Sequence, residues 1–284
     1  MTSTSTVTVH PFDRDITATP DDDSRFTIPL SDEWSINNTP NGGFIMALLA
    51  RAMDPERMDP QRSEQGRVES DHRNRSAIIT ANYLARSKKA PAQIHVETMG
   101  VSNTYIRKQA SLIQDDKLRI QAMATYVRPK EQTFETAYDA SPEPVADWAD
   151  CIRVPAMPGY SLFDRIDLRL DPQSAGWMEG RLADRAVMKG WIQFADHRPI
   201  DLDAVTLFAD CFPPCVFASR GMVAWVPTIE YSVNVRMLPD THRLKGIFTS
   251  RFISGGLVEE DGELWDTAGN LIAISRQIAK YQPV

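Results

Sequence analysis

Twice along this chain of 284 residues, an apolar helical run is followed by several strand-like runs. In the first copy, residues 44–53 are apolar on nearly every helical face, so the predicted helix must be buried, and Asp54-Pro55 ends it. Polar and turn-forming residues then separate runs that are typical of an antiparallel meander. These strands and one ahead of the helix are predicted at residues 25–30, 76–84, 92–100, 105–114 and 118–127.

The second copy has the same order. A strand is predicted ahead of an apolar helix that Pro213-Pro214 ends, and Asp261-Gly262 and Ala268-Gly269 are predicted turns. The helix is predicted at residues 200–211, and the strands at residues 177–182, 228–237, 244–253 and 270–281. A helix followed by a long antiparallel sheet, occurring twice, indicates an α+β chain of two similar units. The alternative is coincidence, because many α+β proteins place a helix before their strands.

Prolines mark the boundary between the two units. Pro142, Pro144, Pro155 and Pro158 lie among acidic residues, and proline favours extended chain that does not pack. We therefore predict a loosely ordered N-terminus at residues 1–24, a first unit at residues 25–138, a linker at residues 139–160 and a second unit at residues 161–284.

The composition narrows the class of protein. With 42% hydrophobic and 24% charged residues, the chain is typical of a globular protein. Its net charge of -7 argues against non-specific binding to nucleic acid or anionic membranes, which needs clustered positive charge. The apolar run at residues 44–50 is too short to span a bilayer, and the N-terminus lacks a secretory signal. Three cysteines, an odd number, favour a reducing compartment, so we expect a cytoplasmic protein without membrane or nucleic-acid partners.

Several catalytic motifs are missing from the sequence. It contains no G-x-G-x-x-G, no P-loop motif, no H-E-x-x-H and no complete serine-hydrolase elbow. Cys211 and Cys215 have the spacing of half a metal site, but no second pair and no nearby histidine accompany them. His95 alternates with apolar strand residues, and the other four histidines lie in polar stretches, which favours structural positions over a catalytic base. We expect no metal and no cofactor.

Three polar residues stand out because their neighbours look buried. Asp210 follows the apolar run at residues 204–209, where a carboxylate is costly unless it is hydrogen-bonded, exposed at a helix end, or functional. Thr228 begins a strand of alternating polar and apolar residues, where β-propensity alone can explain a threonine. Gln277 shares its strand face with small residues, which leaves room for a ligand, although a hydrogen bond to the backbone is the structural alternative.

Together these three side chains can support hydrolysis of a thioester. A carboxylate with an amide or a hydroxyl can orient one water and accept its proton during attack, so no covalent nucleophile is required. Backbone N–H groups at the start of the first helix could stabilise the oxyanion, because Gly42 and Gly43 allow a substrate to approach closely.

The same segments resemble a family, the two-hotdog acyl-CoA thioesterases of the bacterial thioesterase II type, over residues 26–281. The resemblance rests on Trp34 with residues 40–44, on residues 107–127, on Gly190-Trp191, on Asp210 with residues 212–214, on the strand that begins at Thr228, and on residues 263–277. It implies a tandem (double) hotdog, in which each half is a long helix wrapped by an antiparallel sheet and the halves form a pseudo-dimer.

The resemblance also implies a water site of aspartate, threonine and glutamine, which Asp210, Thr228 and Gln277 match in order. The first predicted helix offers no acid, and Thr125 falls roughly where Gln277 falls in the second half, so we expect one working site per chain. The expected substrate is an acyl-CoA or a carrier-bound acyl thioester, and the expected assembly is a homo-oligomer. Because some members of this family serve specialised metabolism, the resemblance does not determine which acyl group the substrate carries.

Binding the phosphates of CoA requires cations, and a solvated sheet edge is the alternative explanation for most candidates. The candidates are Arg86, Lys88, Lys89, Arg107 and Lys108. Two other functions compete with hydrolysis. One is a hotdog protein that binds an acyl thioester without cleaving it, and the other is a hotdog dehydratase. The dehydratase would need a histidine near a helix, and neither predicted helix carries one.

Overall fold

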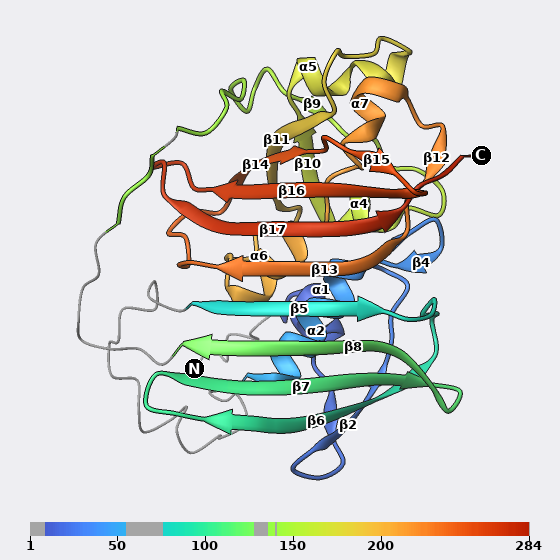
Figure 1. Ribbon diagram of the computed structural model, residues 1–284, viewed down its shortest axis with the longest axis vertical. Helices are drawn as coiled ribbons and strands as arrows, with labels where there is room; N and C mark the ends of the chain where they lie inside the picture. Colours follow the sequence, from blue (N-terminus) through green and yellow to red (C-terminus); the bar gives the residue numbers. More distant parts are fainter. Residues whose placement is uncertain (1–8, 55–75, 128–135, 140, 284) are drawn as a thin grey trace, which may run out of the picture.

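The computed structural model describes residues 9–54, 76–127, 136–139 and 141–283, which form two similar halves joined edge to edge (Figure 1). In the first half, the described helices are α1 Pro11–Asp15 and α2 Gly42–Met53. The strands of this half are β1 Thr19–Pro20, β2 Arg25–Pro29, β3 Ser35–Ile36, β4 Thr39–Pro40, β5 Ala77–Tyr83, β6 Pro91–Val101, β7 Tyr105–Gln114 and β8 Lys117–Val127.

The second half follows the same plan with longer connections. Its helices are α4 Leu162–Arg165, α5 Pro172–Ala175, a 3₁₀ helix at Gly176–Glu179, α6 Leu202–Phe208 and α7 Val216–Arg220. Its strands are β9 Ile152–Arg153, β10 Ile166–Leu170, β11 Val187–Phe194, β12 Ala224–Trp225, β13 Thr228–Val235, β14 Leu244–Thr249, β15 Ile253–Ser254, β16 Leu257–Trp265, β17 Leu271–Lys280 and β18 Gln282–Pro283.

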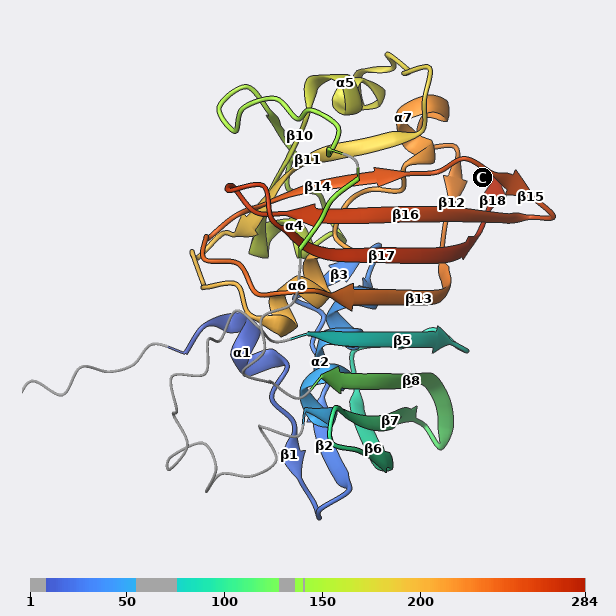
Figure 2. The same ribbon diagram turned by 60° about the vertical axis from the view of Figure 1, so that its left-hand side comes forward.

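One antiparallel sheet of 14 strands runs through both halves. From the outer edge inward, the main strands are ordered β2-β6-β7-β8-β5 in the first half and β11-β14-β16-β17-β13 in the second. Among these five main strands of each half, the one before the buried helix lies outermost and the first one after it lies innermost. The innermost strands β5 and β13 pair with each other, which makes the sheet continuous (Figures 1 and 2). The predicted repeat and the predicted double hotdog fold are confirmed.

Helix α2 begins at an asparagine cap and is buried almost all round. The side chain of Asn41 accepts a hydrogen bond from Phe44 N at 2.9 Å, which satisfies one of the free donors at the helix start. Ten of its twelve residues are buried, against the sheet and against α6. The prediction of a buried helix at residues 44–53 is therefore confirmed, and Pro55, predicted to end it, lies outside the described residues.

Helix α6 is shorter than its apolar run. Asp201 caps its start by accepting from Ala204 N at 3.0 Å, and the helix ends at Phe208 rather than at residue 211. The chain then turns, and Asp210 N donates to Leu207 O at 3.0 Å. This turn carries Asp210 out of the helix and toward the start of α2.

Three parts of the second half differ from the sequence prediction. The predicted strand at residues 177–182 is wrong, because residues 176–179 form the 3₁₀ helix. The sequence prediction contains no strand over β10, β11 or β16, although all three belong to the sheet. The predicted turn at Asp261-Gly262 is also wrong, because both residues lie inside β16, where the ring of Phe248 packs against Gly262 and leaves no space for a larger side chain.

The segments predicted to be loose are partly ordered. The N-terminal prediction is wrong for residues 11–20, since these form α1 and β1, and Phe12 and Ile16 are each 1% exposed. The Phe12 ring lies 5.1 Å from the rings of both Trp34 and Phe194, which ties this segment to the two halves. Within the predicted linker, β9 pairs with β10. The other proposed domain boundaries stay predictions. None of the helices in the described ranges is long and apolar enough to cross a membrane.

Candidate active site

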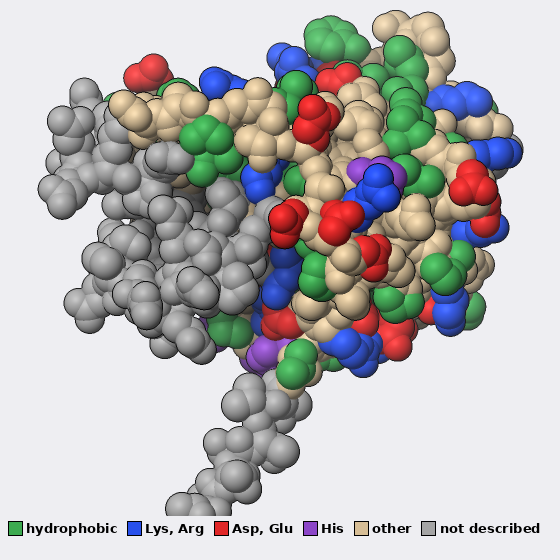
Figure 3. Space-filling model, turned by 90° about the horizontal axis from the view of Figure 1, so that it is seen from below, with side chains coloured by type: hydrophobic (Ala, Val, Ile, Leu, Met, Phe, Trp, Pro, Cys, Tyr) green, Lys and Arg blue, Asp and Glu red, His purple; other side chains and the backbone are tan. Residues whose placement is uncertain are grey.

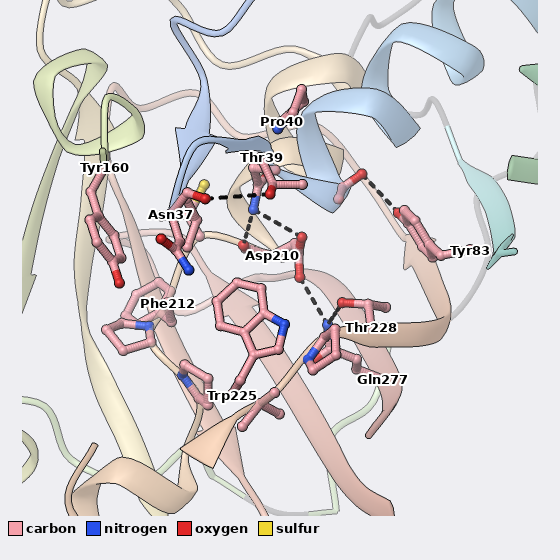
Figure 4. A pocket seen from close by; sticks show the side chains of 18 of the residues that line it. Asn37, Thr39, Pro40, Tyr83, Tyr160, Asp210, Phe212, Trp225, Thr228 and Gln277 are labelled. Carbon is pink, nitrogen blue, oxygen red and sulfur yellow. Dashed lines mark hydrogen bonds between the residues drawn. The ribbon is translucent and has the colours of Figure 1, made fainter. Parts of the chain in front are cut away.

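The side chain of Asp210 joins the end of α6 to the start of α2. Its Oδ2 accepts hydrogen bonds from Gly43 N at 2.7 Å and from Asn41 Nδ2 at 3.1 Å, and the same Nδ2 lies 3.0 Å from the backbone oxygen of Asp210 (Figure 4). The carboxyl group thus sits at the positive end of a buried helix from the other half, where a negative charge is favoured.

The other carboxyl oxygen of Asp210 faces the two remaining predicted residues. Gln277 Nε2, on β17, donates to Asp210 Oδ1 at 3.1 Å and to Thr228 Oγ1 at 2.6 Å. Since Thr228 accepts this bond, its own hydroxyl hydrogen is left to point elsewhere. The structure therefore brings Asp210, Thr228 and Gln277 into one hydrogen-bonded group that lines a cavity.

Burial sets the protonation of Asp210. Loss of hydration raises the pKa of its carboxyl group to about 6, while the hydrogen bonds from Gly43, Asn41 and Gln277 oppose this shift. The group is therefore mostly ionised at neutral pH, and it is a stronger base than an aspartate in water. Such a pKa suits a general base that works near neutral pH.

The two glycines at the start of α2 have different roles. Gly43 N is occupied by Asp210, so the prediction of Gly43 as an oxyanion donor does not fit this geometry. Gly42 lines the cavity, and its N–H makes no hydrogen bond within the described part of the chain. Its carbonyl oxygen accepts from Tyr83 Oη at 2.8 Å, which fixes the peptide beside the cavity. Of the two, Gly42 is the donor left for a ligand.

The cavity above these residues has a volume of about 610 Å³. Its interior wall is aromatic and comes mainly from the second half, with Phe163, Phe212 and Phe217 each less than 10% exposed. Its mouth carries the exposed residues Arg86, Met222 and Trp225 beside Asn37. In Figure 4, Phe212, Tyr160 and Trp225 lie on one side of Asp210 and Tyr83 lies on the other. The cavity can hold an apolar group with a polar end at the surface.

A second carboxyl group in this cavity was not predicted. Glu260 lies on β16 directly opposite Gln277, and its Oε2 accepts from Cys215 N at 2.8 Å. Burial raises the pKa of Glu260 to about 7, and the nearby charge of Asp210 adds to this shift. The sequence does not indicate Glu260 as a site residue, because the next two residues, Asp261-Gly262, predict a turn.

Only one of the five candidate cations belongs to the cavity. Arg86 lines it and donates to Asn37 O at 3.2 Å. Lys88 pairs with Asp115 at 2.8 Å and Lys89 with Asp32 at 3.0 Å. The other two candidates, Arg107 and Lys108 on β7, do not line the cavity, and Lys108 is 8% exposed. The predictions for these four residues are not supported. On the face shown in Figure 3, basic and acidic side chains lie interspersed with one another.

The described part of the first half has no equivalent of this polar group. Thr80 and Ser232 face each other across β5 and β13, with their hydroxyl oxygens 2.9 Å apart, and mark the centre of the repeat. The residues before them, Ile79 and Tyr231, pair with Ala124 and Gln277 respectively. Thr125 is not the counterpart of Gln277 as expected, since Thr125 points to the face of its strand opposite to the buried residues, whereas Gln277 lines the cavity.

The acid is replaced as well. Counting from the helix caps, Ala50 follows Asn41 by as many residues as Asp210 follows Asp201, and Ala50 is fully buried. The described residues contain no group of His, Cys, Asp or Glu that could hold a metal ion, and all three cysteines are free.

Comparisons with known proteins agree with this description. Sequence models of the acyl-CoA thioesterase N-terminal domain and C-terminal domain match residues 30–127 and 137–280. No curated protein matches the sequence. A hot-dog-fold protein of unknown function from Alicyclobacillus acidocaldarius is 22% identical with a TM-score of 0.81, covering 98% of this chain and 100% of that one.

Two further structures share the fold. A proposed thioesterase II from Thermobifida fusca YX is 22% identical with a TM-score of 0.80, covering 97% of this chain and 98% of that one. The acyl-CoA thioesterase II TesB2 from Mycobacterium marinum is 14% identical with a TM-score of 0.70, covering 96% and 98%. The chain is thus a double hotdog protein. It belongs to the acyl-CoA thioesterase family, whose members are thioester hydrolases.

Proposed function

We propose that this protein hydrolyses acyl-CoA thioesters with a water that Asp210 activates. The observation that carries the proposal is the single hydrogen-bonded group of Asp210, Gln277 and Thr228 at the wall of a 610 Å³ cavity, beside an unused backbone N–H of Gly42. A base, a water-positioning group and an oxyanion donor then meet at one place, which is what hydrolysis without a covalent intermediate requires.

In the proposed reaction, a water donates one hydrogen bond to Asp210 Oδ1 and accepts one from the Thr228 hydroxyl. Asp210 removes a proton as the water oxygen bonds to the thioester carbon, and the carbonyl oxygen becomes an oxyanion that Gly42 N–H stabilises. The C–S bond then breaks. The CoA thiolate takes the proton from Asp210, which leaves a free acid, CoA and the starting carboxylate. Thiols are much more acidic than alcohols, so the thiolate leaves readily.

Gln277 has a positioning role in this scheme. Its amide binds both Asp210 and Thr228, so it fixes the distance between the proton acceptor and the hydroxyl that orients the water. The acyl group would extend toward the buried aromatic wall. The CoA moiety would extend out of the cavity past Arg86 at the mouth, where a guanidinium can pair with phosphate.

Two alternatives are less well supported. A dehydratase needs a catalytic histidine, and no histidine of the described chain lines the cavity. A protein that only binds acyl thioesters would not need the Asp210 carboxyl group, with its pKa raised to about 6, beside the residues that position the water. A carrier-bound thioester is an alternative substrate. Cytoplasmic location, homo-oligomerisation and a place in specialised metabolism remain predictions from the sequence.

The test is CoA release from a panel of acyl-CoAs by the wild-type protein and by Asp210→Asn. Removing the base should lower kcat by roughly 10²- to 10⁴-fold, while KM changes only a few-fold because Asn keeps the shape and most hydrogen bonds of Asp. Asp184→Asn makes the same chemical change at an exposed site of the second half and should leave kcat unchanged. Equal CoA release by wild-type and Asp210→Asn protein would show that Asp210 is not the base.

A further inference from the structure

Glu260 lies next to the proposed water site, one strand further into the second half. On the sheet, Thr228, Gln277 and Glu260 come from the successive strands β13, β17 and β16, and Glu260 is the direct partner of Gln277. Directly paired residues of an antiparallel sheet point to the same face with their Cβ atoms about 5 Å apart. The Glu260 carboxyl therefore shares the cavity with the reacting group.

Among the described residues, the hydrogen bonds of this carboxyl are incomplete. Oε2 accepts from Cys215 N at 2.8 Å, and the nearby Cys215 thiol is only a weak donor. Asp210, in contrast, accepts from three strong donors. A carboxylate can accept about four hydrogen bonds, and leaving that capacity unused in an apolar cavity is unfavourable. Glu260 is thus able to accept a hydrogen bond from a ligand.

The acyl group is the part of the substrate that would pass Glu260. The hydrogen bond to Cys215 attaches Glu260 to the segment that carries Phe212 and Phe217, two rings of the buried aromatic wall. The exposed mouth, with Arg86 and Trp225, is where the CoA moiety would leave. Since Gln277 stands beside the thioester and Glu260 follows it toward the wall, Glu260 would meet the first carbons of the acyl chain.

We propose that Glu260 binds a hydroxyl group near the thioester end of the acyl chain, so that hydroxyacyl thioesters are the preferred substrates; this inference rests on the proposed function. A plain alkyl chain would cover the carboxyl without offering a donor, whereas a hydroxyl supplies one. A hydroxyl fits better than an ammonium group, because a second charge would have to lose its hydration against the aromatic wall.

The experiment compares kcat/KM for 3-hydroxyoctanoyl-CoA, as each enantiomer, with kcat/KM for octanoyl-CoA. At pH 8, where most of the Glu260 carboxyl group is ionised, wild-type protein should prefer one hydroxylated enantiomer by roughly 10- to 100-fold, the range for a hydrogen bond to a charged group. In Glu260→Met, which removes every acceptor, this preference should fall to about onefold, and in Glu260→Gln, whose neutral amide oxygen is a weaker acceptor, it should fall to a few-fold at most. Gln retains an acceptor for Cys215 N, so it guards against loss of folding. Glu230→Gln, on exposed β13 surface, is the matched control and should keep the preference.

A second measurement separates this inference from the proposed function. Calorimetric binding of the same CoA thioesters to Asp210→Asn protein needs no hydrolysis and should show the same preference, again lost when Glu260→Met is added. If wild-type protein releases no CoA, the proposed function fails and the binding preference still decides the role of Glu260. Equal affinity and equal kcat/KM for hydroxylated and plain chains would overturn the inference. So would a preference that persists without Glu260, or an equal loss on both substrates.

Discussion

At the scale of single residues, burial dominates the chemistry of the two carboxyl groups in the cavity, Asp210 and Glu260. Both lose hydration inside the molecule, which raises the pKa of each. Asp210 accepts from Gly43, Asn41 and Gln277 and reaches a pKa of about 6, whereas Glu260 has one backbone donor and the Asp210 charge nearby and reaches about 7. At neutral pH Asp210 is therefore mostly ionised and able to act as a base, whereas Glu260 is about half ionised.

The pH dependence of kcat/KM should follow from the first of these values. The base is active when it has lost its proton, so kcat/KM for octanoyl-CoA should rise with pH through an apparent pKa of about 6 and then level off. Asp184→Asn should keep this acid limb, since it leaves the cavity unchanged. An acid limb near pH 4, the ordinary range of an aspartate, would contradict the raised pKa on which the proposed base depends.

Only some of the site residues could be predicted from the sequence. Asp210 could be predicted because a carboxylate after an apolar helix is unusual, and Gln277 because its neighbours on the strand are small. Glu260 could not, since its importance depends on its pairing with Gln277 and on the backbone of Cys215, which lie far away in the chain. Nor could the sequence divide the roles of Gly42 and Gly43, because the partner of Gly43 N belongs to the other half.

At the scale of elements, the site depends on how closely the start of α2 approaches the end of α6. A Cβ atom added to Gly43 would lie 2.7 Å from Asp210 Cβ and 2.9 Å from Leu207 O. Real Cβ atoms do not come so close to other atoms, so any side chain at this position must push the two helices apart. The absence of a side chain at Gly43 therefore permits the 2.7 Å bond from its N–H to Asp210.

Gly43→Ala should accordingly damage both stability and catalysis. Overpacking at a close contact costs about 1 to 3 kcal/mol of the free energy of unfolding, and the displaced helix should lower kcat by more than about tenfold. Gly100→Ala, a site with no atom within 4 Å of an added Cβ, is the control. Thermal unfolding and CoA release measure the two effects, and an alanine variant with wild-type kcat would show that the contact between α2 and Asp210 is dispensable.

The predicted elements succeeded where the hydrophobic pattern was regular. Strands β5 to β8 and helix α2 lie close to the predicted ranges, because their turns are polar and their apolar runs are distinct. Strand β11 was missed because seven of its eight residues are buried, so it lacks the alternation that marks a strand with one face in solvent. Helix α6 was predicted too long because apolar residues continue through Ala209 and Cys211 after the helix ends.

At the scale of the whole molecule, two halves of one topology share a sheet but not a function. The first half supplies the donors Asn41 and Gly43, while the second supplies Asp210, Thr228 and Gln277. In the first half, the residue at the same distance from the helix cap as Asp210 is Ala50, which has no carboxyl group. The repeat could be predicted from the order of elements. The sharing of one site between the two halves could not, because it depends on packing across the β5–β13 junction.

In the proposed function, the two hotdog halves of one chain share a single acyl-CoA site, built around Asp210 and completed by the first half. The most direct measurement is the stoichiometry of acyl-CoA binding to Asp210→Asn protein, which should bind substrate without consuming it. Titration calorimetry with octanoyl-CoA should give one site per chain, and adding Ala224→Trp, which fills the wall of the cavity, should abolish it. Binding of two octanoyl-CoA molecules per chain, or binding to the protein with the filled cavity, would contradict a single shared site.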